Sequence, residues 1–361
     1  PDFYRVKAWP IDGQNFIGAY FDDMYFYCTG EILDLRSGGT LDGVDFRLPH
    51  GGGFSGTVTD GETGQPLESA RIDVRGLDYY NSNLDPTTYT DADGVFEVVG
   101  LDSAIESLDN PVPVPGNYEL KVTVAGRPVI YHPGVYTSTD AEPVGAIRGE
   151  ILEDVDLALP PGGRIEGLVT GEDGLPATSG SVRGRNDEQT WMSVTVGLGD
   201  DGGFALGGLA PGPWSLEVRA DGLAAAATAE PIEVPEDGQV DGVELVLGPE
   251  ATLSGTVAGP AGPVAEVIVS ASPVDGGVDA TAESDQDGSF TVQGLASGSY
   301  VIHLRTSDDT LLSGYLCGGT VCEQSADGEP VPVDGAEDVD MGAVALPAAA
   351  LIEGRVVDRE S

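Results

Sequence analysis

A short pattern recurs four times along this chain of 361 residues and constrains its fold more than any other feature. Each copy has an apolar residue, a glycine two positions later and a valine two positions after that, and the copies begin at Phe54, Ile165, Leu253 and Ile352. The four glycines lie 111, 88 and 99 residues apart, which fits whole domains and is too long for the coils of a solenoid. The pattern therefore predicts an array of related domains.

Further landmarks follow the first three glycines in the same order. A turn with glycine and proline leads into an alternating segment, an acidic turn ends at an aromatic residue, and a last alternating segment closes the unit. The acidic turns span 91–96, 199–204 and 285–290, and the closing segments span 155–159, 243–247 and 339–341. Asp-Gly between alternating segments is a strong hairpin signal, and apolar residues at every second position predict strands with one buried face.

A Leu-x-x-Gly-x-aromatic step lies between the hairpin and the closing segment. It ends at Trp214 in the second unit and at Tyr300 in the third. In the first unit a proline-rich insertion at 102–115 separates Leu101 from the matching Tyr118. We interpret the three aromatic residues as equivalent positions of one repeated fold.

No segment sustains a helical period, whereas 53 glycines and 25 prolines supply the turns that short strands need. We therefore predict an all-β chain of tandem antiparallel β-sandwich, Ig-like domains in an elongated array. The predicted segments are the C-terminal part of a repeat at 1–50, whole repeats at 54–163, 164–251 and 252–350, and the first strand of a further repeat at 351–361. We expect a window of a longer array, the alternative being that the incomplete ends join copies by strand addition.

The charge balance excludes several kinds of partner. Sixteen lysines and arginines stand against 61 aspartates and glutamates, so the formal net charge is −45. Such a surface repels phosphate backbones and anionic lipid head groups, and we expect no nucleic-acid partner. The sequence has no apolar run of about 18 residues, so it predicts no membrane insertion in this segment.

The order of these motifs resembles the carboxypeptidase regulatory-like domain, which is related in shape to the Cna protein B-type repeats. The matching residues are Gly56, Val58, Asp93, Gly94, Phe96, Gly255, Val257, Asp287, Gly288, Phe290, Leu295, Gly298 and Tyr300. The resemblance covers residues 54–350 and implies tandem transthyretin-like, or prealbumin-like, sandwiches of a large secreted or surface protein of bacteria or archaea. It implies a structural module, because a shared fold does not transfer an activity.

The acidic turns are also candidate metal sites. Asp91, Asp93, Asp285 and Asp287 offer the carboxylate oxygens that calcium prefers. None of these turns has the full spacing of an EF-hand loop, and the competing interpretation is a solvated hairpin turn. We therefore expect no cofactor, with calcium as the alternative.

Two cysteines are spaced for a local disulfide. Cys317 and Cys322 form a C-x4-C pair after Tyr315, and chains in oxidising compartments join such pairs. Cys28 follows an aromatic run in the first partial unit and has no evident partner in the sequence. We predict a Cys317–Cys322 disulfide in an extracellular protein.

The densest aromatic segment, residues 16–27, is a candidate binding surface. Tyr20, Tyr25 and Tyr27 carry this hypothesis, because carbohydrate-binding surfaces and protein interfaces both use exposed aromatic side chains. The competing interpretation is that the segment packs onto its own sandwich or a neighbouring unit.

No catalytic constellation is expected. His50, His132 and His303 lie in different units, and acidic residues are too numerous for one catalytic pair to stand out. We predict a non-enzymatic extracellular protein, a stalk, fibre or adhesin of sandwich modules on the cell surface. Its expected partners are neighbouring copies of itself or other surface proteins and glycans. The alternative is a carbohydrate- or protein-binding accessory region of a larger secreted hydrolase or transporter.

Overall fold

A computed structural model of the chain describes residues 3–11, 14–21, 31–35, 40–78, 85–105, 113–236 and 238–350. These residues form β-strands, turns and one short 3-10 helix at Ser325–Asp327, so the predicted all-β sandwich class is confirmed. No described helix is long and apolar enough to cross a membrane. The chain divides into two compact units, the first containing residues 1–163 and the second most of the residues after them, and each is described by itself. The finer division into five segments stays a prediction.

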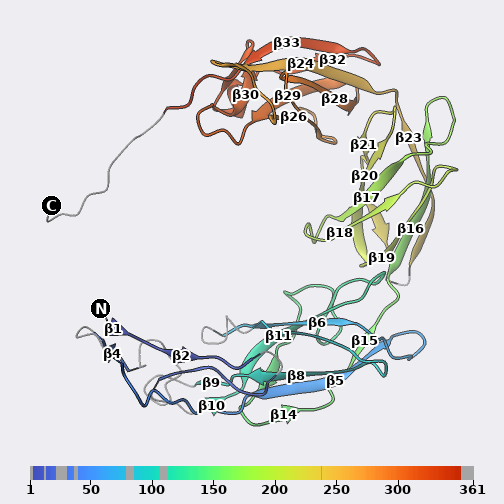
Figure 1. The fold of residues 1–361 in the computed structure, drawn as a ribbon. Coiled ribbons are helices and arrows are strands. Elements are labelled where there is room, and N and C mark those ends of the chain that lie inside the picture. The colour runs from blue at the N-terminus through green and yellow to red at the C-terminus, as the bar shows by residue number, and fades with distance from the viewer. Residues whose placement is uncertain are drawn as a thin grey trace, which may run out of the picture. The chain divides into compact units, whose positions relative to one another are not determined.

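The sandwich of the first unit has two sheets that enclose one core. One sheet has the order β14-β5-β15 with β8 also on β5, and the other has the order β12-β11-β6-β7 with β13 also on β11 (Figure 1). The strands are β5 Gly52–Asp60, β6 Arg71–Gly76, β7 Thr87–Tyr89, β8 Val95–Leu101, β11 Gly116–Thr123, β12 Ile130–Tyr131, β13 Val144–Ala146, β14 Ile151–Leu152 and β15 Leu157–Leu159. Phe54, Ile72, Phe96 and Tyr118 are among the side chains buried between them.

Short strand pairs accompany this sandwich. They are β1 Phe3–Tyr4 with β4 Leu33–Asp34, β2 Lys7–Ala8 with β3 Ala19–Tyr20, and β9 Ala104–Ile105 with β10 Pro113–Val114. Residue Asn15 ties the N-terminal segment to the sandwich, because its carbonyl accepts the backbone N–H of Gly51 and its side-chain oxygen accepts that of Gly100.

The second unit begins with a sandwich built around Trp214, which is fully buried. One sheet has the order β19-β16-β23, and the other has the order β18-β17-β20-β21 with β22 also on β20. The strands are β16 Gly163–Gly171, β17 Gly180–Asn186, β18 Ser193–Gly197, β19 Gly203–Leu209, β20 Gly212–Ala220, β21 Ala226–Ala227, β22 Ile232–Val234 and β23 Gln239–Leu247.

The last sandwich has one continuous sheet that folds over its own core. The order is β25-β24-β33-β31-β30-β29-β26-β27, with β28 on β24 and β32 on β29. The strands are β24 Ala251–Gly259, β25 Gly262–Pro263, β26 Ile268–Pro273, β27 Ala280–Glu283, β28 Ser289–Leu295, β29 Gly298–Arg305, β30 Gly314–Cys317, β31 Thr320–Cys322, β32 Val331–Val333 and β33 Val339–Ala345. The β30–β31 hairpin therefore connects the two layers along one side.

The repeated glycine is required by the last strand of each sandwich. That strand runs parallel to the first strand, in the pairs β5–β15, β16–β23 and β24–β33. A Cβ atom added at Gly56, Gly167 or Gly255 would lie 2.0, 2.2 or 2.9 Å from the carbonyl oxygen of Val155, Val243 or Gly342, respectively. These distances are too short for a real side chain, so the repeat keeps glycine where two backbones approach each other.

The Asp-Gly turns also have one geometry in all three sandwiches. Gly94, Gly202 and Gly288 have φ angles of 74°, 77° and 78°, which glycine adopts without steric cost. Each glycine carbonyl accepts the N–H of the valine in the repeated pattern, at 2.8, 2.9 and 2.8 Å respectively. The turn is thus fixed to the first strand.

The aromatic step forms a corner at two of its three positions. The hydroxyl of Tyr300 donates to the carbonyl oxygen of Ala296 at 2.9 Å and accepts the N–H of Ala296 at 3.0 Å. The hydroxyl of Tyr118 makes the same two bonds to Asp102, at 2.7 and 2.9 Å. This arrangement matches the tyrosine corner of β-sandwiches, and it supports the equivalence of Tyr118 and Tyr300 across the insertion.

Candidate functional site

The four predicted calcium ligands lie in two separate, exposed hairpin turns. Asp91 Oδ1 accepts the backbone N–H groups of Asp93 and Val95 at 3.0 and 2.9 Å. Asp287 Oδ1 accepts the hydroxyl and the N–H of Ser289 at 2.7 and 3.1 Å, and these bonds lower the pKa of Asp287. In the described part of the chain, no three His, Cys, Asp or Glu side chains form a cluster of metal ligands. Two carboxylates therefore close the turns, and calcium binding stays a prediction.

The two cysteines of the C-x4-C pair are joined by a disulfide, with 5.9 Å between their Cα atoms. Cys317 ends β30 and Cys322 ends β31, so the disulfide closes the hairpin. The hairpin contacts the C-terminal end of β33: Thr320 pairs with Ala345, the last residue of that strand, and the Thr320 hydroxyl donates to the Ala345 carbonyl oxygen at 3.1 Å. Cys28 lies outside the described residues.

The predicted aromatic surface is only partly described. Tyr20 is half-buried on β3, while Tyr25 and Tyr27 lie outside the described residues. The Lys7 ammonium is 3.5 Å from the centroid of the Trp9 ring and 5.0 Å from that of Tyr20. Trp9 is 57% exposed, and its ring passes over Gly18, where a Cβ atom would be only 2.6 Å away. A cation between two aromatic rings gains from both.

Sequence reasoning missed Lys7 and Trp9. They are two residues apart, so the alternation of a strand places them on one face, but two positions are too few to establish a period. Burial lowers the pKa of Lys7, and the nearby charge of Asp102 opposes that shift. We call Lys7, Trp9 and Tyr20 the aromatic cluster.

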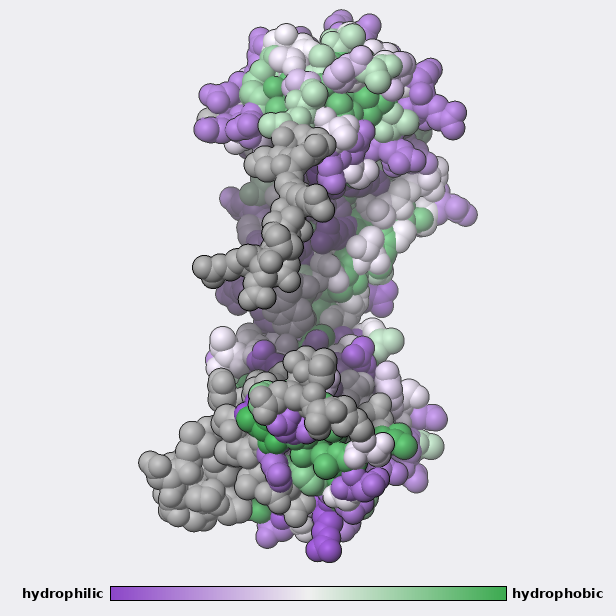
Figure 2. Space-filling model, turned by 60° about the vertical axis from the view of Figure 1, so that its left-hand side comes forward, coloured by the Kyte–Doolittle hydropathy of each residue, from purple (hydrophilic) through white to green (hydrophobic). Residues whose placement is uncertain are grey.

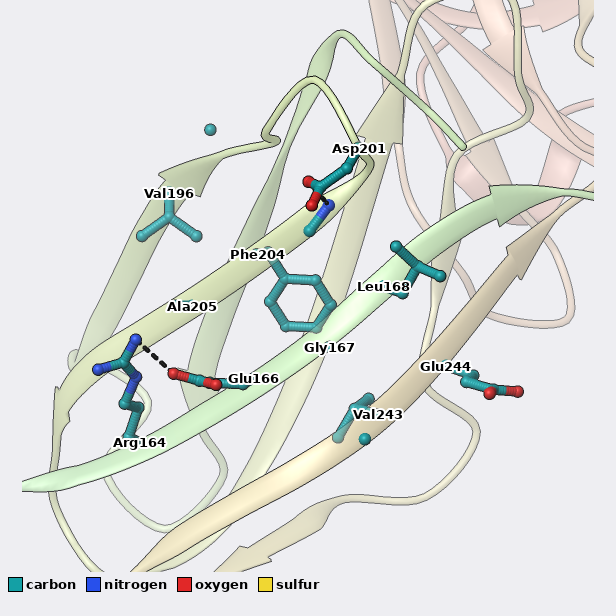
Figure 3. Close-up of a pocket in the computed structure, with 13 residues that line it drawn as sticks. Arg164, Glu166, Gly167, Leu168, Val196, Asp201, Phe204, Ala205, Val243 and Glu244 are labelled. Carbon is teal, nitrogen blue, oxygen red and sulfur yellow. Dashed lines mark hydrogen bonds and ion pairs between the residues drawn. The ribbon is translucent and has the colours of Figure 1, made fainter. Parts of the chain in front are cut away.

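An open groove of about 720 Å³ lies on the sandwich of β16–β23. Figure 3 shows Arg164 and Glu166 joined by an ion pair at one end, and the Phe204 ring against Gly167 in the middle. Asp201 Oδ1 accepts the N–H of Gly203 at 3.0 Å, so this carboxylate is engaged in its own turn. The groove offers a polar strand surface for contact with another molecule and holds no histidine, cysteine or serine among its lining residues.

The three histidines lie apart from one another, and each contacts an aromatic ring or a backbone carbonyl group. His50 stacks on Phe16 with 4.8 Å between ring centroids, and His132 Nδ1 lies 3.1 Å from the carbonyl oxygen of Glu142. His303 packs on Tyr315 at 4.6 Å, and burial, followed by the charge of Arg305, lowers its pKa. None of them shares a hydrogen bond with another histidine or with a carboxylate in the described residues.

No protein-family model matches the chain, and no curated protein does either. Solved structures with similar arrangements include the Bacillus anthracis TIE protein, at 15% identity and a TM-score of 0.23, covering 82% of this chain and 51% of that one. The minor pilin GBS52 of Streptococcus agalactiae has 11% identity and a TM-score of 0.24, covering 54% and 100%. The shaft pilin SpaA of Lactobacillus rhamnosus GG has 12% identity and a TM-score of 0.26, covering 55% and 98%. The chain thus spans about half the length of the TIE protein, and at these scores the likenesses extend to the β-rich fold and no further.

Proposed function

We propose that this chain is a non-enzymatic structural protein of the cell surface, in which tandem carboxypeptidase regulatory-like sandwiches form a stalk or fibre. One observation carries the proposal: the same close glycine contacts and Asp-Gly ties recur in three successive sandwiches. These repeated contacts stabilise the same fold in each sandwich, whereas a catalytic site would give one sandwich residues that the others lack. The groove in Figure 3 is consistent with a structural module, because the side chains that line it stand apart and do not converge on one point.

The charge of the chain suits an exposed, solvated position. Figure 2 shows hydrophilic residues over much of the visible face, with apolar residues gathered in smaller patches. A net charge of −45 keeps such a protein soluble and resists nonspecific association. The disulfide of the last sandwich favours an oxidising, extracellular compartment.

Self-association of the full chain tests the proposal. We expect oligomers that grow with protein concentration in sedimentation velocity and elongated particles in negative-stain electron microscopy. Long-range repulsion between copies should be screened at about 1 M NaCl, where the Debye length is about 3 Å. A chain that remains monomeric at every concentration and salt level would contradict the fibre.

The aromatic cluster favours a second candidate, a carbohydrate-binding accessory region. A glycan array with the full chain tests it, with Trp9→Ala as the variant and Trp191→Ala as the matched control. Trp191 is 54% exposed in the second sandwich, so it is a comparable exposed ring outside the cluster. Saturable binding that only Trp9→Ala removes would favour the accessory region.

We propose that the acidic turns act without a cofactor. Asp287→Asn retains the Oδ1 acceptor for Ser289 and removes one negative charge. We expect the hydrogen-exchange protection of the last sandwich to respond equally to about 1 mM calcium, and to chelator, in the parent chain and in Asp287→Asn. A calcium-dependent rise that Asp287→Asn abolishes would instead establish a calcium site at this turn.

A further inference from the structure

Five strands of the sandwich of β16–β23 pair on one side only among the described strands, namely β18, β19, β21, β22 and β23, and two of them, β18 and β23, lie on opposite sides of the sandwich. β18 pairs only with β17, and β23 pairs only with β16. An unpaired edge presents a row of backbone N–H and C=O groups on which another chain can pair. The two edges lie on opposite sides of the sandwich, because β19 and β23 flank β16 and a tight Asp-Gly turn joins β18 to β19 (Figure 1).

β18 lacks the devices that normally protect a sheet edge, which are shortness, charge, proline and cover. It comprises Ser193–Gly197, with the sequence Ser-Val-Thr-Val-Gly. The equivalent edge strands elsewhere are shorter and better protected: β7 has three residues and follows Pro86, and β27 has four and ends at Glu283. Among these three edges, that of β18 is the most open.

β23 is open for a different reason. In its counterpart in the last sandwich, β33, the last residue Ala345 pairs with Thr320 of the disulfide-closed hairpin, whereas no described strand pairs with the outer edge of β23. Beyond a register shift near Gly242, which has a φ of 72°, β23 continues in regular pairing from Val243 to Leu247. In this part of β23 the side chains of Glu244 and Val246 lie on the outer, exposed face of the strand, and Val246 is 60% exposed.

The face beside the β18 edge is cationic although the chain is strongly acidic. Arg183 and Arg185 on β17 are exposed and form no ion pair or side-chain hydrogen bond with any residue that the structure describes. Arg183 lies opposite Thr195, and Arg185 lies opposite Ser193. These short side chains leave the guanidinium groups room to reach across β18 toward its edge. Arg183 also lies opposite Glu217 on β20, without an ion pair.

We propose that the β23 edge of one copy of this chain pairs with the β18 edge of a second copy, with Glu244 facing Arg183 and Arg185. This proposal rests on the proposed fibre and names the surface that builds it. The segment Val243–Leu247 matches β18 in length, continues its apolar inner face and brings one carboxylate to the cationic outer face. Because the edges lie on opposite sides of the sandwich, the contact does not close into a pair and repeats along a filament.

Two proline variants of the full chain test the edge pairing. Leu198 donates its N–H to Gly180, and N–H directions alternate along a strand, so the N–H of Thr195 points away from β17. Thr195→Pro therefore removes an outward donor and retains the β17–β18 bonds. Thr281→Pro on β27 is the matched control, because Ser284 donates inward to Val267 and the N–H of Thr281 points outward by the same alternation.

The readout is sedimentation velocity and electron microscopy at about 1 M NaCl, with circular dichroism to verify folding. We expect Thr195→Pro to raise the concentration needed for assembly at least tenfold and Thr281→Pro to leave it unchanged. If both variants assemble like the parent chain, the fibre stands and the β18 edge is wrong. If the parent chain itself never assembles, the fibre and the edge are both wrong.

A charge exchange tests the orientation without touching the backbone, and it is measured at about 0.15 M NaCl, because about 1 M NaCl would largely screen the attraction between exposed charges. We expect the double variant Arg183→Glu/Arg185→Glu to weaken assembly at least tenfold, and Glu244→Arg to weaken it as well. Combining all three substitutions in one chain should restore assembly, because the attracting charges are exchanged across the contact. Additive losses without restoration would overturn the placement of Glu244 beside the two arginines.

Discussion

Replacing Tyr300 by phenylalanine isolates the contribution of the tyrosine corner in the last sandwich. The change removes one hydroxyl that donates to the Ala296 carbonyl oxygen at 2.9 Å and accepts the Ala296 N–H at 3.0 Å. The ring stays, so apolar burial is preserved. Each neutral hydrogen bond contributes about 0.5–1.5 kcal/mol, so we expect a loss of about 1–3 kcal/mol of local stability.

Hydrogen exchange of the full chain is the suitable assay, because a chain of several sandwiches does not unfold in one two-state step. Protection of amides in β28 and β29 should fall by a factor of about 5 to 150, since 1.4 kcal/mol is tenfold. Protection in the other sandwiches should not change.

Tyr315→Phe is the matched control. Its ring packs on His303, and its hydroxyl makes no hydrogen bond to a described residue, so a change within about 0.5 kcal/mol is expected. The reasoning is refuted if Tyr300→Phe changes protection less than twofold, or if Tyr315→Phe has an equal effect.

Three further predictions concern other repeated or local features. Gly167→Ala should destabilise its sandwich by about 1–3 kcal/mol in hydrogen exchange, because the new Cβ would lie 2.2 Å from a carbonyl oxygen. Gly207→Ala in the same sandwich should cost less, because a Cβ there meets no atom within 4 Å and the backbone has no positive φ. Replacing Cys317 and Cys322 together by serine should cost about 2 kcal/mol for so short a loop and speed the exchange of the Ala345 amide, whose N–H is donated to Gly319 of the hairpin. Hydrogen bonds donated by the backbone N–H groups of Thr63 and Glu62 and by the Arg127 side chain lower the pKa of Asp60 to about 2. The ionised carboxylate therefore stabilises the fold fully above about pH 4, and this stabilisation is lost as the pH falls toward 2. Asp60→Asn should flatten acid unfolding curves in that window.

The sandwich class was predictable because its signals are local. Asp-Gly turns, strand alternation and the aromatic step each depend on a few neighbouring residues, and the structure confirms the turn geometry at Gly94, Gly202 and Gly288. The equivalence of Tyr118 and Tyr300 across a long insertion also follows from the sequence order.

Features that depend on which strands become neighbours were not predictable. The repeated glycine was visible in the sequence, but its reason is the close, parallel passage of the last strand, which alternation cannot reveal. The C-x4-C spacing predicted a disulfide, while the contact of the hairpin with the end of β33 depends on where the hairpin packs. Lys7 and Trp9 were missed because a cation between aromatic rings has no sequence period.

The parallel pairing of the first and last strands determines how each sandwich resists a force that pulls its N-terminal and C-terminal ends apart. In such a parallel pair, the N-terminal end of the first strand and the C-terminal end of the last strand lie at opposite ends of the ladder. The force therefore acts along the strands and loads all the backbone hydrogen bonds between them. In β16 and β23 seven residue pairs share that load, and they must slide past one another together, whereas an antiparallel hairpin pulled at its open end would separate one pair at a time. The glycine that lets these two backbones approach therefore also lies at the shear plane of the module.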